Sequence, residues 1–290
     1  MKIGYFPGCS LEGSSREYDE SLHAIAGPLG VELAEVPDWN CCGASAAHNL
    51  NHVLALALPA RTLALAERAG LDELLVPCSA CYTRLAVTRH ELLRNETLRQ
   101  QITSVIELDY VGSTRVLSVV ELLARLAPTI RDKTVHPFGH RLACYYGCYL
   151  TRPTCVASCK RTEDPTEMDD ICKAAGATPV DWAFKVECCG AGLSVSRTSS
   201  VAALSARVLE DAVDRGAEAI VVACPMCHTN LDLRRPAIEK AAGRRFDVPV
   251  LYVSQVIGLA LGIDGHVLGL HRHHVPVRWP ASVAGTREEH

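Results

Sequence analysis

Residues 74–81 read LLVPCSAC and residues 221–227 read VVACPMC, so an apolar segment that runs into a CxxC motif occurs twice in the chain. Two more pairs of segments extend this repeat. Residues 37–45, PDWNCCGAS, match residues 183–192, AFKVECCGAG, and residues 5–10, YFPGCS, match residues 145–150, YYGCYL. The same order of three matching blocks in each half predicts an internal duplication of one structural unit.

Each half also shows the same alternation of short apolar segments and longer helical patterns. In the first half we expect strands over residues 2–6, 31–36 and 73–76, with helices over 15–28, over 49–69 and after Cys81. In the second half we expect strands over 141–146, 178–181 and 219–223, with helices over 167–175, over 198–215 and after Cys227. Such alternation is typical of βαβ units. The sequence therefore predicts an α/β fold with two pseudo-symmetric domains, each a small, mostly parallel sheet flanked by helices.

The two predicted domains divide the chain near residue 135. The first covers residues 1–135 with its connecting helices, one of them over 118–127, and the second covers residues 136–265. Residues 266–290 carry five histidines among proline, glycine and charged residues, and we expect a flexible, solvated tail there. These histidines are His266, His271, His273, His274 and His290.

The composition is that of a globular chain, since 48% of the 290 residues are hydrophobic and 21% are charged. A net charge of −4 offers no basic surface to a phosphate backbone, so nucleic acid is not an expected partner. The apolar stretch from Val53 to Ala69 contains Pro59 and charged residues, and it predicts a core helix rather than a membrane span. The N-terminal MKIGYFPGCS lacks a signal-peptide pattern, so we expect a cytoplasmic protein. Its fourteen cysteines then indicate metal or redox chemistry rather than disulfides.

Ten cysteines fall into the repeated blocks, and each group of them follows a predicted strand. In parallel α/β sheets ligands bind beyond the carboxyl ends of the strands, so the five cysteines of each half should converge. Gly43 and Gly190 allow the sharp turn that lets two adjacent cysteines serve one site. The first group is Cys9, Cys41, Cys42, Cys78 and Cys81, and the second group is Cys148, Cys188, Cys189, Cys224 and Cys227.

Several kinds of site could use cysteines in this pattern. A structural zinc ion takes four ligands, and a thioredoxin-type CxxC would leave the adjacent pairs without a role. Five soft thiolates that converge on one point fit a multi-iron sulfide cluster best.

The blocks YFPGCSLEGSSREYDES, DWNCCGAS, PCSAC, YYGCYLTRP, ECCGAG and CPMCHTNL resemble those of the cysteine-rich CCG-domain family, which includes the B subunit of heterodisulfide reductase. The resemblance covers nearly the whole chain. It implies two CCG domains, each with a noncubane 4Fe–4S cluster on its own group of five cysteines. It also implies a catalytic oxidoreductase subunit that reduces a small or carrier-bound disulfide, or oxidises thiols, between the two clusters. The partners it implies are a C-like iron–sulfur subunit and an A-like flavin subunit.

Chemistry favours two clusters, because reducing a disulfide takes two electrons and an iron–sulfur cluster commonly passes one at a time. No GxGxxG motif follows a predicted strand, so we expect neither flavin nor NAD on this chain. An alternative is an electron-transfer subunit of a sulfur-oxidising or organic-acid-oxidising system, since CCG domains also occur there. Relatives of that kind usually add CxxCxxC runs, and this chain has none. A zinc-binding structural protein is a third interpretation.

Four cysteines lie outside the repeated pattern, namely Cys144, Cys155, Cys159 and Cys172. We expect structural thiols there, with Cys172 in the core, rather than a third metal site. Arg152 follows the YYGC block and is a candidate for holding an acidic substrate near the second cluster. An ordinary surface arginine is the alternative.

Overall fold

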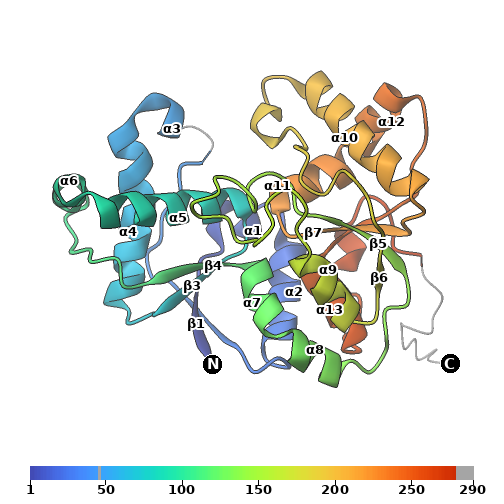
Figure 1. Cartoon of the computed structure of the whole chain (residues 1–290), viewed down its shortest axis with the longest axis horizontal. Coiled ribbons are helices and arrows are strands. Elements are labelled where there is room, and N and C mark those ends of the chain that lie inside the picture. Colours follow the sequence, from blue (N-terminus) through green and yellow to red (C-terminus); the bar gives the residue numbers. More distant parts are fainter. Residues whose placement is uncertain (45–46, 279–290) are drawn as a thin grey trace.

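The structure, a computed structural model, describes residues 1–44 and 47–278, apart from the side chain of His48. Within these residues it forms two four-stranded sheets in which all paired strands are parallel (Figure 1). The first sheet has the order β2-β1-β3-β4, with β1 at Lys2–Tyr5, β2 at Glu32–Glu35, β3 at Glu73–Val76 and β4 at Arg115–Ser118. The second repeats it as β6-β5-β7-β8, with β5 at Arg141–Tyr145, β6 at Thr178–Pro179, β7 at Ala219–Val222 and β8 at Val250–Tyr252. The predicted duplicated α/β fold is confirmed.

Helices connect the strands in both halves. Those of the first half are α1 (Gly8–Glu12), α2 (Arg16–Ala26), α3 (Ala47–Leu50), α4 (His52–Arg68), α5 (Ser79–Arg94), α6 (Glu96–Ile106), α7 (Val119–Arg125) and α8 (Ala127–Lys133). Those of the second half are α9 (Glu167–Ala174), α10 (Thr198–Asp214), α11 (Pro225–His228), α12 (Arg235–Ala242) and α13 (Val253–Ala260). A π-helical turn at Thr229–Leu233 lies between α11 and α12.

The six strands expected from the sequence are present, with their ends shifted by at most two residues. The sequence patterns did not indicate β4 and β8. Both strands run directly into a helix, because Ser118 and Tyr252 end a strand and also cap α7 and α13. No turn residue therefore separates these strands from the helices that follow.

Helices that pack across a pseudo-twofold hold the halves together. The first long helix of each half lies against a late helix of the other, so α2 contacts α13 and α9 contacts α7. In the α2–α13 contact the ring centroids of Tyr18 and Tyr252 are 4.0 Å apart, and the hydroxyls of Ser21 and Ser254 are 2.7 Å apart. All four side chains are buried, so one continuous core joins the two halves.

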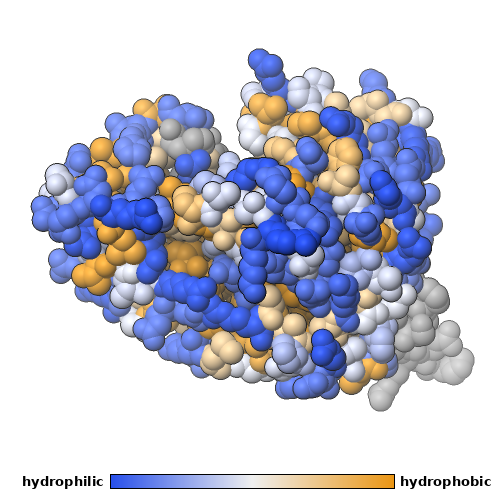
Figure 2. Space-filling model, in the orientation of Figure 1, coloured by the Kyte–Doolittle hydropathy of each residue, from blue (hydrophilic) through white to orange (hydrophobic). Residues whose placement is uncertain are grey.

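The molecule has two ends with a narrower middle (Figure 1). Helices α4, α5 and α6 form one end, α10 and α12 form the other, and α1 and α11 lie between them. Figure 2 shows a notch in the surface between α3 and the segment that precedes α10. These two segments follow the CCG motifs of the two halves. Among the helices of the described residues, none has the length and apolar character needed to cross a bilayer.

The prediction of a flexible, solvated tail is wrong for residues 266–278. Leu268 and His273 are buried, and the amide of Gln255 donates to the carbonyl of Leu268 at 3.0 Å. The backbone N–H groups of His274 and Val275 donate to the buried carboxylate of Asp232 at 2.7 and 3.2 Å. This segment stays on the molecule because its polar backbone and its leucine find partners there. His290 and the rest of residues 279–290 lie outside the described residues.

Candidate metal centres

The cysteines of the first half gather beyond the carboxyl ends of β1, β2 and β3. Cys9 lies in α1 directly after β1, Cys41 and Cys42 lie in the loop after β2, and Cys78 and Cys81 lie at the start of α5 after β3. The Sγ atoms of Cys42 and Cys81 are 3.0 Å apart. Cys9 and Cys41 are exposed and the other three are buried. This group therefore has one side open to solvent and one side in the core.

The second half repeats this arrangement beyond β5, β6 and β7. Cys148 lies in the turn after β5, Cys188 and Cys189 lie in the loop after β6, and Cys224 and Cys227 lie at the start of α11. The Sγ atoms of Cys189 and Cys227 are 3.6 Å apart, and those of Cys148 and Cys188 are 3.9 Å apart. Cys188 is exposed and Cys148 is half-buried. The structure thus brings together the five cysteines that the sequence grouped in each half.

The two groups meet at Cys78 and Cys224, whose thiols lie beside each other. Beside them the hydroxyl of Ser79 donates to the carbonyl of Ala223 at 3.2 Å. All four residues are buried. The CxxC segments of the two halves therefore start side by side, and the ten cysteines form one composite site.

Both CCG motifs turn at their glycine, as the sequence predicts. Gly43 and Gly190 have φ values of 71° and 80°, a backbone conformation that residues other than glycine rarely adopt. The N–H of Gly43 donates to Cys41 Sγ at 3.5 Å, and that of Gly190 donates to Cys188 Sγ at 3.3 Å. Each turn therefore presents a backbone donor to the first cysteine of its pair.

A second pair of glycines, Gly8 and Gly147, lies next to cysteine sulfur. A Cβ atom placed on Gly147 would lie 3.1 Å from Cys227 Sγ, and one on Gly8 would lie 3.5 Å from Cys81 Sγ. Both glycines directly precede the first cysteine of their half. A larger residue at position 147 would crowd the sulfur of Cys227, which explains why this residue is glycine.

Contacts among the thiols distribute their protons unevenly. Hydrogen bonds from Cys41 and Cys81 lower the pKa of Cys42 to about 3, and the hydrogen bond from Cys148 lowers the pKa of Cys188 to about 6. The partner thiols hold the protons, and the hydrogen bond to Cys42 raises the pKa of Cys41. Each half thus has a thiol that is ionised near neutral pH, which is the form that binds metal.

The donor set fits a group larger than one metal ion. A tetrahedral zinc ion with Zn–S bonds of about 2.3 Å would hold its sulfurs roughly 3.8 Å from one another. In the described part of the chain, no three cysteine sulfurs lie within 4.8 Å of one another. Five soft donors spread over this space suit a cluster of several iron and sulfide ions.

Arg152 lies in the segment after Cys148, where its guanidinium donates two hydrogen bonds to the carboxylate of Glu163 at 2.7 and 2.8 Å. Both side chains are largely exposed. This ion pair uses only the Nη2 nitrogen of Arg152, so the other N–H groups of the guanidinium can donate to a substrate acid.

The four remaining cysteines do not gather into one site. Cys144 and Cys172 are fully buried with their Sγ atoms 3.8 Å apart, Cys159 is buried, and Cys155 is exposed. Cys172 lies in the core, as expected. Among the described residues, no three of these sulfurs lie close enough to share a metal ion.

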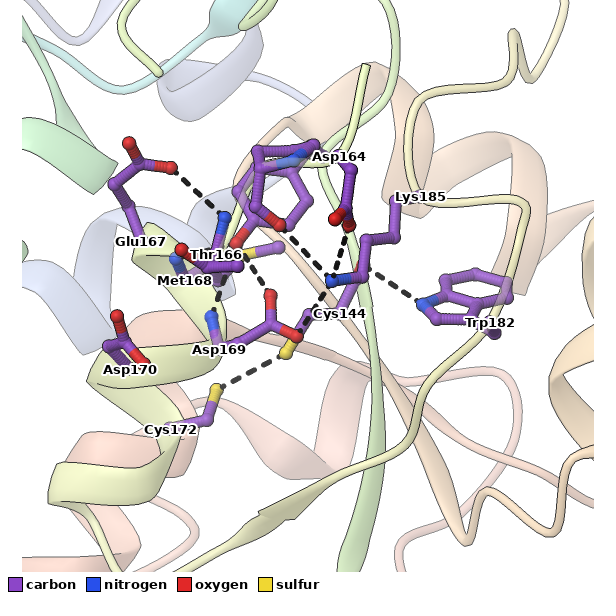
Figure 3. Close-up of polar contacts among 12 residues, drawn as sticks. Cys144, Asp164, Thr166, Glu167, Met168, Asp169, Asp170, Cys172, Trp182 and Lys185 are labelled. Atoms are coloured by element: carbon purple, nitrogen blue, oxygen red, sulfur yellow. Dashed lines mark hydrogen bonds and ion pairs between the residues drawn. The ribbon is translucent and has the colours of Figure 1, made fainter. Parts of the chain in front are cut away.

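A buried ion pair, which the sequence patterns did not indicate, supports the second group of cysteines (Figure 3). The ammonium of Lys185 lies 3.1 Å from Asp169 Oδ1 and 3.3 Å from Asp164 Oδ1. The hydroxyl of Tyr146 donates to the other oxygen of Asp169 at 2.6 Å. This network ties Tyr146, which precedes Cys148, and Lys185, which precedes Cys188, to α9.

The backbone of Lys185 also joins the two loops that carry cysteines. Its carbonyl accepts hydrogen bonds from the N–H groups of Tyr146 and Gly147, at 2.8 and 3.1 Å. Gly147 precedes Cys148, and Lys185 lies three residues before Cys188. One residue therefore sets the position of both loops.

A second buried polar cluster consists of His228, Asp232 and His273, with one nitrogen or oxygen of each within 4.8 Å of the others. The amide oxygen of Gln255 accepts from the N–H of Tyr252 at 2.9 Å, so its amide nitrogen donates to His273 Nε2 at 2.8 Å. His273 then carries its proton on the nitrogen that faces His228. Burial lowers the pKa of both histidines. The cluster is a hydrogen-bonded clamp of neutral rings that holds the C-terminal segment.

Comparison with known proteins agrees with the duplication. The profile of the cysteine-rich domain (CCG) matches residues 3–86 and 142–232, once in each half. A solved structure of a hypothetical protein from Helicobacter pylori superposes with a TM-score of 0.76 over 96% of this chain and 52% of that one. Its sequence identity is 15%, so the likeness concerns the fold alone.

Two curated proteins are similar along almost their entire length. The 8-methylmenaquinol:fumarate reductase membrane anchor subunit of Wolinella succinogenes is 34% identical over 94% of this chain and 96% of its own. The B subunit of the ferredoxin/F(420)H(2)-dependent CoB-CoM heterodisulfide reductase of Methanosarcina acetivorans is 31% identical over 94% of each chain. With a domain match in each half and relatives of equal extent, the chain belongs to the cysteine-rich CCG-domain family that includes the heterodisulfide reductase B subunits.

Proposed function

We propose that this chain is the iron–sulfur subunit of a heterodisulfide reductase-like complex and that it reduces a disulfide, or oxidises two thiols, between two noncubane 4Fe–4S clusters. Cys9, Cys41, Cys42, Cys78 and Cys81 would hold one cluster, and the five matching cysteines of the second half would hold the other. The family and the heterodisulfide reductase relatives support an iron–sulfur subunit of such a complex. The cluster type and the catalytic role are our proposal.

The contact between Cys78 and Cys224 carries this proposal. It places the two groups of thiols directly beside each other rather than at the far ends of two separate domains. A disulfide bond needs two electrons, and iron–sulfur clusters commonly supply one each. Two adjacent one-electron carriers can therefore act on one S–S bond without releasing a sulfur radical.

The protein's own residues would hold, shield and expose the clusters. The N–H groups of Gly43 and Gly190 donate to cysteine sulfur, and such hydrogen bonds raise the reduction potential of an iron–sulfur cluster. The buried cysteines of each CxxC motif keep water from the inner side. Exposed Cys41 and Cys188 leave an outer side that a substrate can approach.

The notch between α3 and the segment before α10 is the proposed route for the substrate (Figure 2). Arg152 would bind an acidic substrate through the guanidinium N–H groups that do not contact Glu163. We further propose that a C-like iron–sulfur subunit delivers electrons from an A-like flavin subunit, and that the complex is cytoplasmic. A reducing compartment keeps the ten thiols of the two groups available for metal.

Variants of equivalent cysteines test this proposal. Purified without oxygen, the chain should contain roughly eight irons, four for each cluster. We expect Cys42→Ser to remove or convert only the first cluster and Cys189→Ser only the second, as seen by iron analysis and EPR. Cys155→Ser is the matched control and should keep all its iron. In the assembled complex, both ligand variants should lose disulfide turnover. A colourless, zinc-containing protein, or unaltered signals in Cys42→Ser, would overturn the ligand assignment.

An electron-transfer subunit of a quinol-linked reductase is the second candidate. The relative named as a subunit of 8-methylmenaquinol:fumarate reductase, at 34% identity over 94% of this chain, favours it. The two candidates differ in which compound exchanges electrons with the chain. Rapid reduction of the oxidised chain by a menaquinol analogue, with no reoxidation of the reduced chain by low-molecular-weight disulfides, would favour the quinol-linked function, and the reverse result would favour the first proposal.

A further inference from the structure

A recess away from the ten cysteines has the character of a binding site. Its cavity of about 270 Å³ is lined by one face of α5, by the start of β4, by Glu121 of α7 and by residues 155–157 of the second half. Strand β4 contacts both α5 and α7, and the three elements lie next to one another in Figure 1. The recess is therefore built from both halves of the chain.

The lining of the recess is positively charged although the chain as a whole is negative. Three guanidinium groups, from Arg89, Arg94 and Arg115, face one carboxylate, from Glu121. Arg115 is paired with Glu121 at 3.2 Å. Arg89 donates to the carbonyl of Gly112 at 3.0 Å, and Arg94 is exposed. Among the described residues neither of these two guanidinium groups pairs with a carboxylate, so the recess has positive charge that suits an anionic group.

The recess also contains a thiol. Of the four cysteines outside the repeated pattern, only Cys155 is exposed, and it lines this cavity. The neighbouring residue Val156 is fixed in place, because the hydroxyl of Tyr82 donates to its carbonyl at 2.8 Å. Cys155 is therefore held in the wall of a basic cavity and not at a free loop tip.

We propose that this recess binds small anionic disulfides and that Cys155 exchanges with them. The thiolate of Cys155 attacks one sulfur of the bound disulfide R–S–S–R. A Cys155–S–S–R bond forms, the original S–S bond breaks, and R–S⁻ leaves with the electron pair, while the proton of Cys155 passes to solvent. One disulfide is exchanged for another, so the ligand itself is the oxidant. The arginines bind the anionic ends of R.

The test compares two reagents on the iron-loaded full-length chain without oxygen. Dithiobisnitrobenzoate carries two carboxylates, whereas dithiodipyridine is uncharged. We expect a fast phase that releases one thionitrobenzoate per chain, with the adduct on Cys155 in peptide mass mapping. Cys155→Ser should lack this phase. Arg89→Gln and Arg94→Gln should each slow the reaction with dithiobisnitrobenzoate about fivefold, as expected for one charge near an anion, and leave dithiodipyridine unaffected.

Controls separate binding from folding. Arg131→Gln removes an exposed arginine of α8 outside the recess and should react like the parent chain. Because Arg94 is exposed, its variant keeps the test valid even where Arg89→Gln disturbs packing. A fast phase that persists in Cys155→Ser, or arginine variants that slow both reagents equally or neither, would overturn the proposal. Neither outcome affects the proposed function. Its test measures the iron content and the EPR signals of the clusters, which depend on other cysteines.

Discussion

Replacing Lys185 by Met removes the cation from a buried ion pair while keeping a side chain of similar length. The side chains of Lys185 and Asp169 are each 7% exposed, so the carboxylate would stay buried without its counter-charge. Breaking a buried pair from one side costs about 3–5 kcal/mol. The hydroxyl of Tyr146 still donates to Asp169, which places the expected loss in the free energy of unfolding near the lower end, at about 3 kcal/mol.

Urea unfolding of the iron-loaded chain, followed by circular dichroism without oxygen, measures this loss. With a slope of about 3 kcal/mol per molar urea for a chain of this size, the midpoint should fall by about 1 M. Lys173→Met is the matched control, because Lys173 pairs with Asp170 at 3.0 Å on the same helix but both side chains are about 60% exposed. Such a pair is worth less than about 1 kcal/mol. Equal midpoints for the two variants would refute the role of burial.

The pKa values of the pair give a second, independent signature. Burial lowers the pKa of Lys185, but attraction to Asp169 outweighs it and leaves the pKa above its ordinary value of 10.5. This stabilisation is complete below pH 10.5 and is lost as the pH rises through the folded-state pKa. The alkaline loss of stability should therefore be flatter in Lys185→Met than in the parent chain. Asp169→Asn should cost less than Lys185→Met, since Asp164 remains 3.3 Å from the ammonium.

Three further predictions concern other residues. The double variant of Cys155 and Cys159 to Ser should keep its full iron content and lose roughly 1 kcal/mol of stability at most, so that a missing metal ion by elemental analysis would indicate a third centre. Burial lowers the pKa of His273 below its ordinary value of 6.5. The stability that the neutral ring contributes is therefore present above pH 6.5 and is lost as the pH falls. His273→Gln should flatten the decline in urea midpoint between about pH 7 and pH 5. Arg84→Gln should lower the reduction potential of the first iron centre alone, by on the order of 40 mV in an EPR-monitored titration, and an equal shift of both centres would contradict it.

Much of the fold was predictable because its signals are local. Each CxxC motif directly follows a buried strand, and repetition of the blocks around Cys42 and Cys189 identified the two halves. The ends of parallel strands then had to bring each group of five together. The strands β4 and β8 escaped prediction because Ser118 and Tyr252 lead from strand to helix without a turn residue.

Local sequence patterns could not predict the contacts between distant segments. The thiols of Cys78 and Cys224 meet only because helices of the two halves pack across each other, and no periodicity in either segment encodes that packing. Lys185 finds its carboxylate on a helix that precedes it in the chain, and buried His273 contacts residues of α11 and α13. Isolated polar residues of this kind resemble surface residues until their partners are known.

The duplication places equivalent thiols in unequal surroundings. Arg84 and Asn230 each lie three residues after the second cysteine of their CxxC motif. In addition to hydrogen bonds from neighbouring thiols, the charge of Arg84 lowers the pKa of Cys42, and its Nε is buried without a hydrogen-bond partner. Asn230 is neutral and donates to the carbonyl of Cys189 at 3.1 Å. A cation beside a thiolate ligand stabilises an added electron, so the first of the two proposed clusters should be the easier to reduce. Electrons that enter the chain would then reach the two sides of a substrate disulfide in a defined order, which a strictly symmetric pair of domains could not impose.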